Sequence, residues 1–294
     1  MSQLGAAALP VERASVRARD RLSRRIGRTP PAVIGGLLVA CVVLVALAAP
    51  LLAAHDPAAQ IATPLLRPGG GFSGGTDQLG RDELSRIIFG ARVSLYVGVL
   101  SVAVALALGG TAGVLAGFYG GWIDNVTMRV MDILFALPAL VLAIAITAVL
   151  GPSLTNVMLA IGIVYAPTFA RIARGPTLAV VRLPYVEAAR AIGASTPAIM
   201  LRHIVPNVSA PLLVQTTVSL STAILTEAAL SFLGLGTQPP TPSWGLMLSD
   251  ARQYMLIDPW VAVLPGLAIA VTVLGFNLLG DGLRDVLDPR IRTL

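Results

Sequence analysis

The sequence contains no lysine, because all of its 21 basic residues are arginines. A phosphate-binding Walker A loop needs a lysine beside its glycine-rich turn, so this chain cannot form that nucleotide site. The chain also has one cysteine, Cys41, and only two histidines, His55 and His203, which are far apart in the sequence. These absences exclude an internal disulfide, a cysteine-based metal cluster and a zinc protease with an H-E-x-x-H motif.

Charged residues are also scarce in this chain. They make up 12% of the 294 residues, whereas soluble domains carry about a quarter. Hydrophobic residues make up 55%, and the mean hydropathy is +0.81. This composition excludes a disordered chain and argues against a soluble enzyme. We therefore interpret the net charge of +6 as a signal of membrane orientation rather than of nucleic-acid binding.

Uncharged apolar runs long enough to cross a membrane recur along the chain. A spanning helix needs roughly 20 apolar residues. The turn-forming run 151–156 divides a longer stretch into two spans, which Pro138 and Pro167 are expected to kink. The runs predict an all-α, polytopic membrane protein with six transmembrane helices, at 33–54, at 94–118, two within 132–171, at 208–232 and at 259–280.

Arginines are distributed unequally between the two sides of these spans. If the N-terminus lies in the cytoplasm, sixteen arginines fall on the cytoplasmic side and five on the other, which predicts that both termini are cytoplasmic. The run at 33–54 is too long for the apolar region of a signal peptide. The chain then divides into a cytoplasmic arginine-rich tail (1–32), an uncleaved first anchor (33–54), an extracytoplasmic segment (55–93) and a core (94–294).

The extracytoplasmic segment begins with prolines and glycines and ends in a helical pattern. Leu84, Ile87 and Ile88 recur at helical spacing. Asp82 is placed to pair with Arg86 one turn further on. We therefore expect an amphipathic helix that lies on the outer surface before the second span begins.

Loop 171–207 carries two short helical patterns on the expected cytoplasmic face. Pro184 and Pro197 each suit the first turn of a helix, and Pro206 is expected to end the second helix before the fifth span. Gly193 places a bend between the two helices. From these residues alone, the loop is either an interfacial connector or a surface against which another protein packs.

Four ordered blocks of the sequence resemble one protein family. Blocks at 75–95, 227–245 and 280–290 are similar to the C-type permease subunit of dipeptide/oligopeptide ABC importers. Loop 171–207 resembles the EAA loop of ABC importer permeases, E-A-A-x3-G-x9-I-x-L-P. The isoleucine lies one place late, and valine stands where the family has leucine. The residues that carry this last resemblance are Glu187, Ala188, Ala189, Gly193, Ile204 and Pro206.

The resemblance implies the transmembrane domain of a type I ABC importer, with cytoplasmic coupling helices, in a bacterial inner membrane. Such a permease forms the pathway for peptide uptake with a homologous B-type permease, and an extracytoplasmic binding protein delivers the peptide. Two partner ATPases bind ATP and magnesium, so this chain would be a transport subunit that binds no cofactor itself, contacts membrane lipids and binds no nucleic acid. The residues implied to couple to the ATPase are Tyr185, Glu187, Ala188, Ala189, Gly193, Ile204 and Pro206.

The substrate and two features of the spans have alternative interpretations. Nickel, haem or another small solute could replace peptide; a secondary transporter is a more remote alternative, because no internal repeat is apparent. Glu227, the one carboxylate well inside a span, is either a gate or a structural group, as are Pro138 and Pro167. A glycine series in the second span packs either within this chain or against the partner permease: Gly109, Gly110, Gly113 and Gly117.

Overall fold

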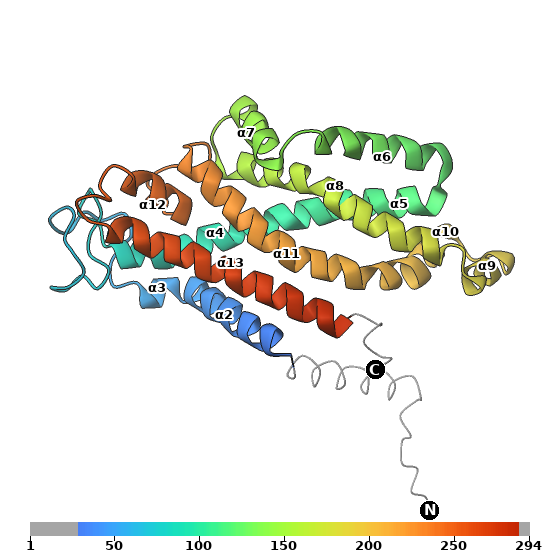
Figure 1. The fold of residues 1–294 in the computed structure, drawn as a ribbon, viewed down its shortest axis with the longest axis horizontal. Helices are drawn as coiled ribbons and strands as arrows, with labels where there is room; N and C mark the ends of the chain where they lie inside the picture. The colour runs from blue at the N-terminus through green and yellow to red at the C-terminus, as the bar shows by residue number, and fades with distance from the viewer. Residues whose placement is uncertain (1–28, 288–294) are drawn as a thin grey trace, which may run out of the picture.

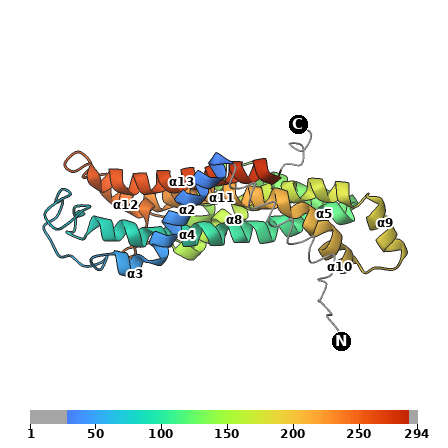
Figure 2. The same ribbon diagram turned by 90° about the horizontal axis from the view of Figure 1, so that it is seen from below.

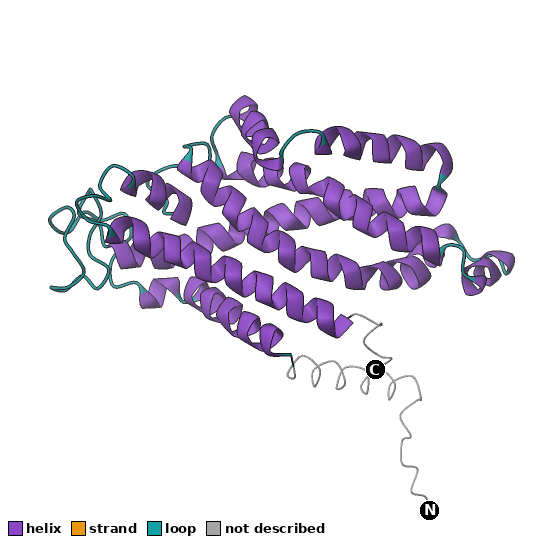
Figure 3. Ribbon diagram, in the orientation of Figure 1, coloured by secondary structure: helices purple, strands orange, loops and turns teal. Residues whose placement is uncertain are grey.

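The computed structural model describes residues 29–287, which form helices and loops with no strand among them (Figure 3). The arginine-rich tail up to residue 28 and the end of the C-terminal block, 288–294, lie outside the described residues. The helices are α2 (Pro30–Leu47), α3 (Ala49–Leu52), α4 (Glu83–Ala105), η1 (Leu106–Gly110), α5 (Thr111–Tyr119), α6 (Gly121–Phe135), α7 (Ala139–Leu150), α8 (Leu154–Val180), α9 (Pro184–Ala191), α10 (Thr196–Ile199), η2 (Met200–Ile204), α11 (Val205–Phe232), α12 (Trp244–Ala251) and α13 (Trp260–Leu287).

Five helical segments are long and apolar enough to cross a membrane. They are α2, the continuous run from α4 to α5, α8, the continuous run from α10 to α11, and α13, and they lie roughly along one axis in Figure 1. A sixth crossing is possible through α6 and α7, which meet at 89°. The predicted six spans therefore agree with the structure if this bent pair counts as one span.

The third span begins earlier than the sequence predicted. The predicted start at Asp132 is wrong, because α6 already begins at Gly121. Pro138 lies in the break between α6 and α7. Proline has no N–H to donate and disfavours the helical conformation in the residue before it, which accounts for the break. Pro167, in contrast, lies inside α8, which runs on past it.

Two spans are longer than predicted, because segments expected to be separate are continuous. α4 begins at Glu83 and runs into the membrane segment without a break, so the predicted separate surface helix is wrong. The prediction that Pro206 ends a helix is also wrong, because η2 joins α10 to α11. Pro206 lies in the first turn of α11, directly after the π-helical turn η2 (Met200–Ile204).

The backbones of η1 and α5 are in direct contact with the backbone of α8. A Cβ atom at Gly113 would lie 2.2 Å from the carbonyl oxygen of Ala170, and one at Gly109 would lie 1.9 Å from that of Ala166. Only glycine permits such an approach between helices. Packing within this chain is thus confirmed for these glycines, and α8 lies at the centre of the largest apolar cluster.

The first span lies along the last one. Figure 1 shows α2 beside α13, and in Figure 2 α2 crosses in front of the bundle towards it. The contact is close because a Cβ atom at Gly35 would lie 2.3 Å from the backbone nitrogen of Leu279. The two ends of the described chain are therefore held together on one side of the bundle.

The end of the bundle that carries α12 is held together by buried charges. Arg81 contacts Asp77, and Arg86 Nε lies 3.3 Å from Asp77 Oδ2. Both arginines also face Asp250 of α12, at 3.7 and 4.0 Å. Arg86 therefore does not have the predicted partner: Asp82 accepts a hydrogen bond from the N–H of Ser85 and caps α4. This cluster joins the segment before α4 to α12.

Candidate functional site

Helix α9 forms the tip of the bundle opposite α12 (Figure 1). It begins at Pro184, as predicted, because proline suits the first helical turn. It ends in a Schellman motif: the N–H of Ala194 donates to the carbonyl of Ala189, and the N–H of Gly193 donates to that of Arg190, both at 3.0 Å. Local residues therefore fix both ends of this short helix, Pro184 at its start and Gly193 after its last turn.

Gly193 is needed for its backbone conformation. Its φ is +80°, a region that side chains other than glycine rarely adopt. Within residues 29–287, nothing lies within 4 Å of the position that a Cβ atom would take. The predicted bend at Gly193 is therefore a left-handed turn, and the requirement for glycine there is a property of the fold.

The two faces of α9 differ in chemistry. Tyr185, Glu187 and Ala188 are exposed, whereas Val186 and Ala189 point into an apolar cluster. That cluster also contains Ala173, Val180, Ile199, Ile204 and Val208. The residues predicted to couple to the ATPase therefore fall into two groups. Tyr185, Glu187 and Ala188 face outward. Ala189 and Ile204 are buried in the apolar cluster beneath the helix.

Pro206 belongs to neither group. It is exposed in the first turn of α11. The structure thus brings together Tyr185, Glu187, Ala188, Ala189 and Gly193 on one short helix and its end, with Ile204 packed beneath them.

Two side-chain contacts attach α9 to different spans. At its start, the ring of Tyr185 lies 5.6 Å from that of His203, and Asn207 Nδ2 donates to the Tyr185 hydroxyl at 3.3 Å and to the His203 carbonyl at 2.6 Å. At its end, the guanidinium of Arg190 lies 5.3 Å from the centre of the Phe118 ring. Sequence reasoning missed these contacts; the one available signal was His203, which stands where the EAA pattern expects isoleucine.

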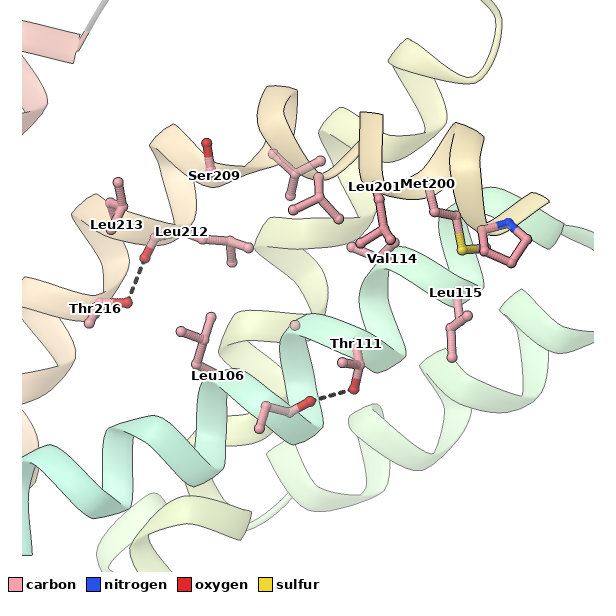
Figure 4. A pocket seen from close by; sticks show the side chains of 15 residues that line it. Leu106, Thr111, Val114, Leu115, Met200, Leu201, Ser209, Leu212, Leu213 and Thr216 are labelled. Atoms are coloured by element: carbon pink, nitrogen blue, oxygen red, sulfur yellow. Dashed lines mark hydrogen bonds between the residues drawn. The ribbon is translucent and has the colours of Figure 1, made fainter. Parts of the chain in front are cut away.

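A groove of about 680 Å³ opens in the half of the bundle nearer α9 (Figure 4). One wall consists of η1 and α5, and the other consists of α10, η2 and the start of α11. The three hydroxyls in its lining are satisfied locally: Thr216 donates to the carbonyl of Leu212 and Ser209 to that of Pro206, both at 2.8 Å, and Thr111 donates to that of Ala107. The lining is otherwise mostly apolar, including Leu106, Val114, Leu115, Met200, Leu201, Leu212 and Leu213.

Glu227 lies far along α11 and is fully buried. It accepts hydrogen bonds from the hydroxyls of Ser231 at 2.7 Å, Ser94 at 3.3 Å and Thr237 at 3.5 Å. These donors come from α11, α4 and the loop before α12. The contacts are those expected of a structural group that holds this loop, and a gating role for Glu227 stays an untested prediction.

Helix α6 is fastened to α8 by two arginines whose role the sequence did not reveal. Arg174 makes two parallel bonds to Asp124, one of them 2.6 Å long. Arg171 donates to Asp132 at 2.7 Å. These partners are 39 and 50 residues apart in the sequence, which is why neither pairing could be read from local spacing.

Two family profiles match this chain. The profile described as "Binding-protein-dependent transport system inner membrane component" matches residues 109–293. The profile described as "N-terminal TM domain of oligopeptide transport permease C" matches residues 21–68. Together they cover the first span, α9 and most of the residues that line the groove.

Curated relatives and a solved structure resemble the chain over most of its length. The glutathione transport system permease protein GsiD of Pectobacterium atrosepticum is 46% identical over 92% of this chain and 90% of its own. The di/tripeptide transport system permease protein DppC of Pseudomonas aeruginosa is 49% identical over 88% of both. A chain of the inward-facing MetNI methionine ABC transporter is 19% identical with a TM-score of 0.55, over 68% of this chain and 96% of that one.

Proposed function

The chain belongs to the family of inner membrane components of binding-protein-dependent transport systems, and from this premise we propose that it is the C-type permease of an importer for short peptides. The resemblance noted in the sequence is thereby confirmed: the protein is a transmembrane component of an ABC importer, with the all-α fold of the MetNI chain. The proposal extends this family membership to a substrate class, to partner proteins and to an orientation in the membrane.

The proposed substrate class rests on the relatives. Their names specify glutathione, which is a tripeptide, and di- and tripeptides. Both relatives lie above 45% identity over about nine-tenths of the chain. Short peptides are therefore the proposed cargo, and nickel, haem and other small solutes are the alternatives that an uptake assay must separate.

The proposed partners follow from α9, which is the observation that carries the proposal. An eight-residue helix at the tip of the bundle, with Glu187 and Ala188 on its outer face, offers a small compact surface for another protein. Because the chain lacks any lysine for a phosphate loop, ATP and magnesium would bind to partner ATPases docked on α9. A homologous B-type permease would complete the pathway, and an extracytoplasmic binding protein would meet the α12 end.

The proposed orientation places α9 and both termini in the cytoplasm of a bacterial cell, with the α12 end outside. The arginine distribution supports it. In a chain carrying Cys41→Ala, an impermeant thiol reagent added outside intact cells should label Ser73→Cys and spare Ser195→Cys; both side chains are accessible. Labelling of Ser195→Cys without labelling of Ser73→Cys would show that the chain has the opposite orientation.

The function is tested by reconstitution. The chain is co-expressed with a homologous second permease, partner ATPases and an extracytoplasmic binding protein, and uptake of a labelled dipeptide into proteoliposomes is measured with ATP. We expect uptake that unlabelled di- and tripeptides compete away and that nickel and haem do not. A complex whose ATPases carry an inactivated Walker lysine is the control. Transport of nickel or haem with no response to peptides would refute the peptide assignment.

A further inference from the structure

Glu83 carries a buried carboxyl group in the charge cluster at the α12 end. It is the first residue of α4 and is 2% exposed. The charged groups that face it are Arg86 on its own helix, Asp77 and Arg81 in the segment before α4, and Asp250 on α12. These four contact one another. Within residues 29–287, however, no hydrogen bond or ion pair reaches the carboxyl group of Glu83.

The charges of this cluster do not balance if every carboxyl group is ionised. Two arginines face three carboxyl groups, those of Asp77, Glu83 and Asp250. Asp77 has the shortest contacts with both arginines and also accepts hydrogen bonds from two backbone N–H groups, at 2.8 and 2.9 Å. The side chain of Asp250 is 29% exposed, so water also solvates its charge. A buried carboxylate without a partner is costly, which leaves Glu83 as the group that a proton must neutralise.

The cavity beside Glu83 is too small for a larger ligand. It has a volume of about 10 Å³, and Asp77, Arg86 and Asp250 also line it. A cavity needs about 10–15 Å³ to hold a single water molecule. In the part of the chain that the structure describes, no group of histidine, cysteine or acidic residues is placed to bind a metal ion. The ligand that fits this site is therefore a proton, alone or with one water molecule.

We propose that Glu83 is a proton-binding site that locks the α12 end of the bundle. With the proton bound, two arginines balance two aspartates, and the cluster joins the segment before α4 to α12. Loss of the proton adds a third carboxylate, which repels Asp77 and Asp250. The contacts of Asp250 with the arginines, at 3.7 and 4.0 Å, are the longest in the cluster. The attachment of α12 is therefore the one that opens.

The direction of the pH dependence follows from proton linkage. In the closed arrangement Glu83 holds a proton, whereas water that enters an open α12 end solvates the carboxylate and lets the proton leave. The closed arrangement thus binds one more proton than the open one, so closure weakens as the pH rises. Protons reach the site through the exposed side of Asp250. That they come from the medium outside the cell is the one step that rests on the proposed function.

Infrared spectroscopy of the full-length chain in lipid nanodiscs detects the proton directly. A protonated carboxyl group has a carbonyl stretching band that a carboxylate lacks. Glu227 is also buried, so the band is assigned from the spectrum of the wild type minus that of Glu83→Gln. We expect this difference to contain the band at neutral pH. Glu187→Gln is the matched control, because Glu187 is exposed at the opposite end, and its difference spectrum should lack the band.

Asp250→Asn tests the charge balance. The substitution removes one of the three carboxyl groups and keeps the shape of the side chain, so an arginine becomes available to Glu83. Glu83 should then be ionised, and the band should be lost although the glutamate is still present. This comparison also assigns the band if Glu83→Gln does not fold. A band that persists in Asp250→Asn would overturn the inference, because charge balance would then not be what holds the proton.

The lock is measured with a cysteine at Met247, a buried residue of α12 that lines the same cavity. In a Cys41→Ala background, the rate at which Met247→Cys reacts with a thiol reagent is divided by the rate for the same cysteine combined with Glu83→Gln. This ratio cancels the ionisation of the thiol itself. We expect the ratio to rise about threefold or more from about pH 6 to about pH 9, because Glu83 can release its proton and glutamine has none to release.

Two further results would overturn the inference. A difference spectrum without the band would show that Glu83 is charged in the closed arrangement. A constant ratio of thiol rates, with the band present, would show that the proton is bound but does not lock the α12 end. These measurements need no ATP, partner protein or import, so their failure leaves the proposed function standing, and a failure of import leaves the proton site standing.

Discussion

Replacing Gly113 by alanine should force α5 and α8 apart. The added Cβ atom would lie 2.2 Å from the carbonyl oxygen of Ala170 and 2.8 Å from its carbonyl carbon. Both are backbone atoms, so no side-chain rotation can relieve the overlap. An ordinary carbon–oxygen contact is roughly 3.4 Å, which means that the helices must separate by about 1 Å and lose packing along their shared length.

The magnitude is set by two opposing effects. Alanine is favoured over glycine inside a helix by about 1 kcal/mol. Overpacking in a well-packed contact costs about 1–3 kcal/mol, and a clash between backbones belongs to the upper part of that range. We therefore expect Gly113→Ala to lower stability by about 1–2 kcal/mol.

Gly110 provides a matched control three residues away. A Cβ atom there would meet only the flexible side chain of Leu106, at 3.3 Å, because Gly110 faces the groove. Gly110→Ala should keep the helix-propensity gain of up to about 1 kcal/mol. The assay is the melting temperature of the detergent-purified chain, at one heating rate, followed by tryptophan fluorescence, since Trp244 is buried. Equal melting temperatures for the two variants would refute the reasoning.

Three further predictions concern single residues. Gly193→Ala should strain the left-handed turn by about 1 kcal/mol, and Gly193→Asn should strain it by less. The affinity for the ATPase should therefore be lower for the alanine variant than for the asparagine variant. Equal affinities would contradict this prediction. Glu227→Gln should be tolerated, whereas Glu227→Leu leaves buried hydroxyls unpaired and should lower stability by about 1–3 kcal/mol, measured by thermal unfolding; an inactive but fully stable Glu227→Gln would favour gating instead. A double-mutant cycle on Arg174 and Asp124 should give a larger coupling energy than one on the more exposed pair of Arg171 and Asp132, for which about 0–1 kcal/mol is expected. The reverse order would show that the Arg174–Asp124 pair is not the main attachment of α6 to α8.

The sequence predicted the spans because their length is set by the membrane. The uncharged runs that correspond to α2, α8, α11 and α13 were long enough to be recognised as membrane spans without any tertiary information. The start of α9 at Pro184 was also predicted, because proline and helix formers are local signals. The family resemblance added the identity of the residues on α9.

Features that depend on distant partners were not predictable. Asp124 of α6 pairs with Arg174, which is 50 residues away, so local spacing gives no signal of this pairing. Arg86 was assigned to Asp82, one helical turn before it, whereas it pairs with Asp77 and Asp250. The π turns and the groove between them leave no periodic signal, because they arise from how two spans pack.

The buried charges at the α12 end have a consequence for the order of biosynthesis. Arg81 and Asp250 are separated by about 170 residues, a length that takes on the order of 10–30 s to translate at roughly 5–20 residues per second. During this interval Arg81 and Arg86 have Asp77 beside them but lack the carboxylate from α12. This end of the bundle therefore closes only after the fifth span has been made, and a nascent chain released earlier displays two arginines that the finished protein conceals.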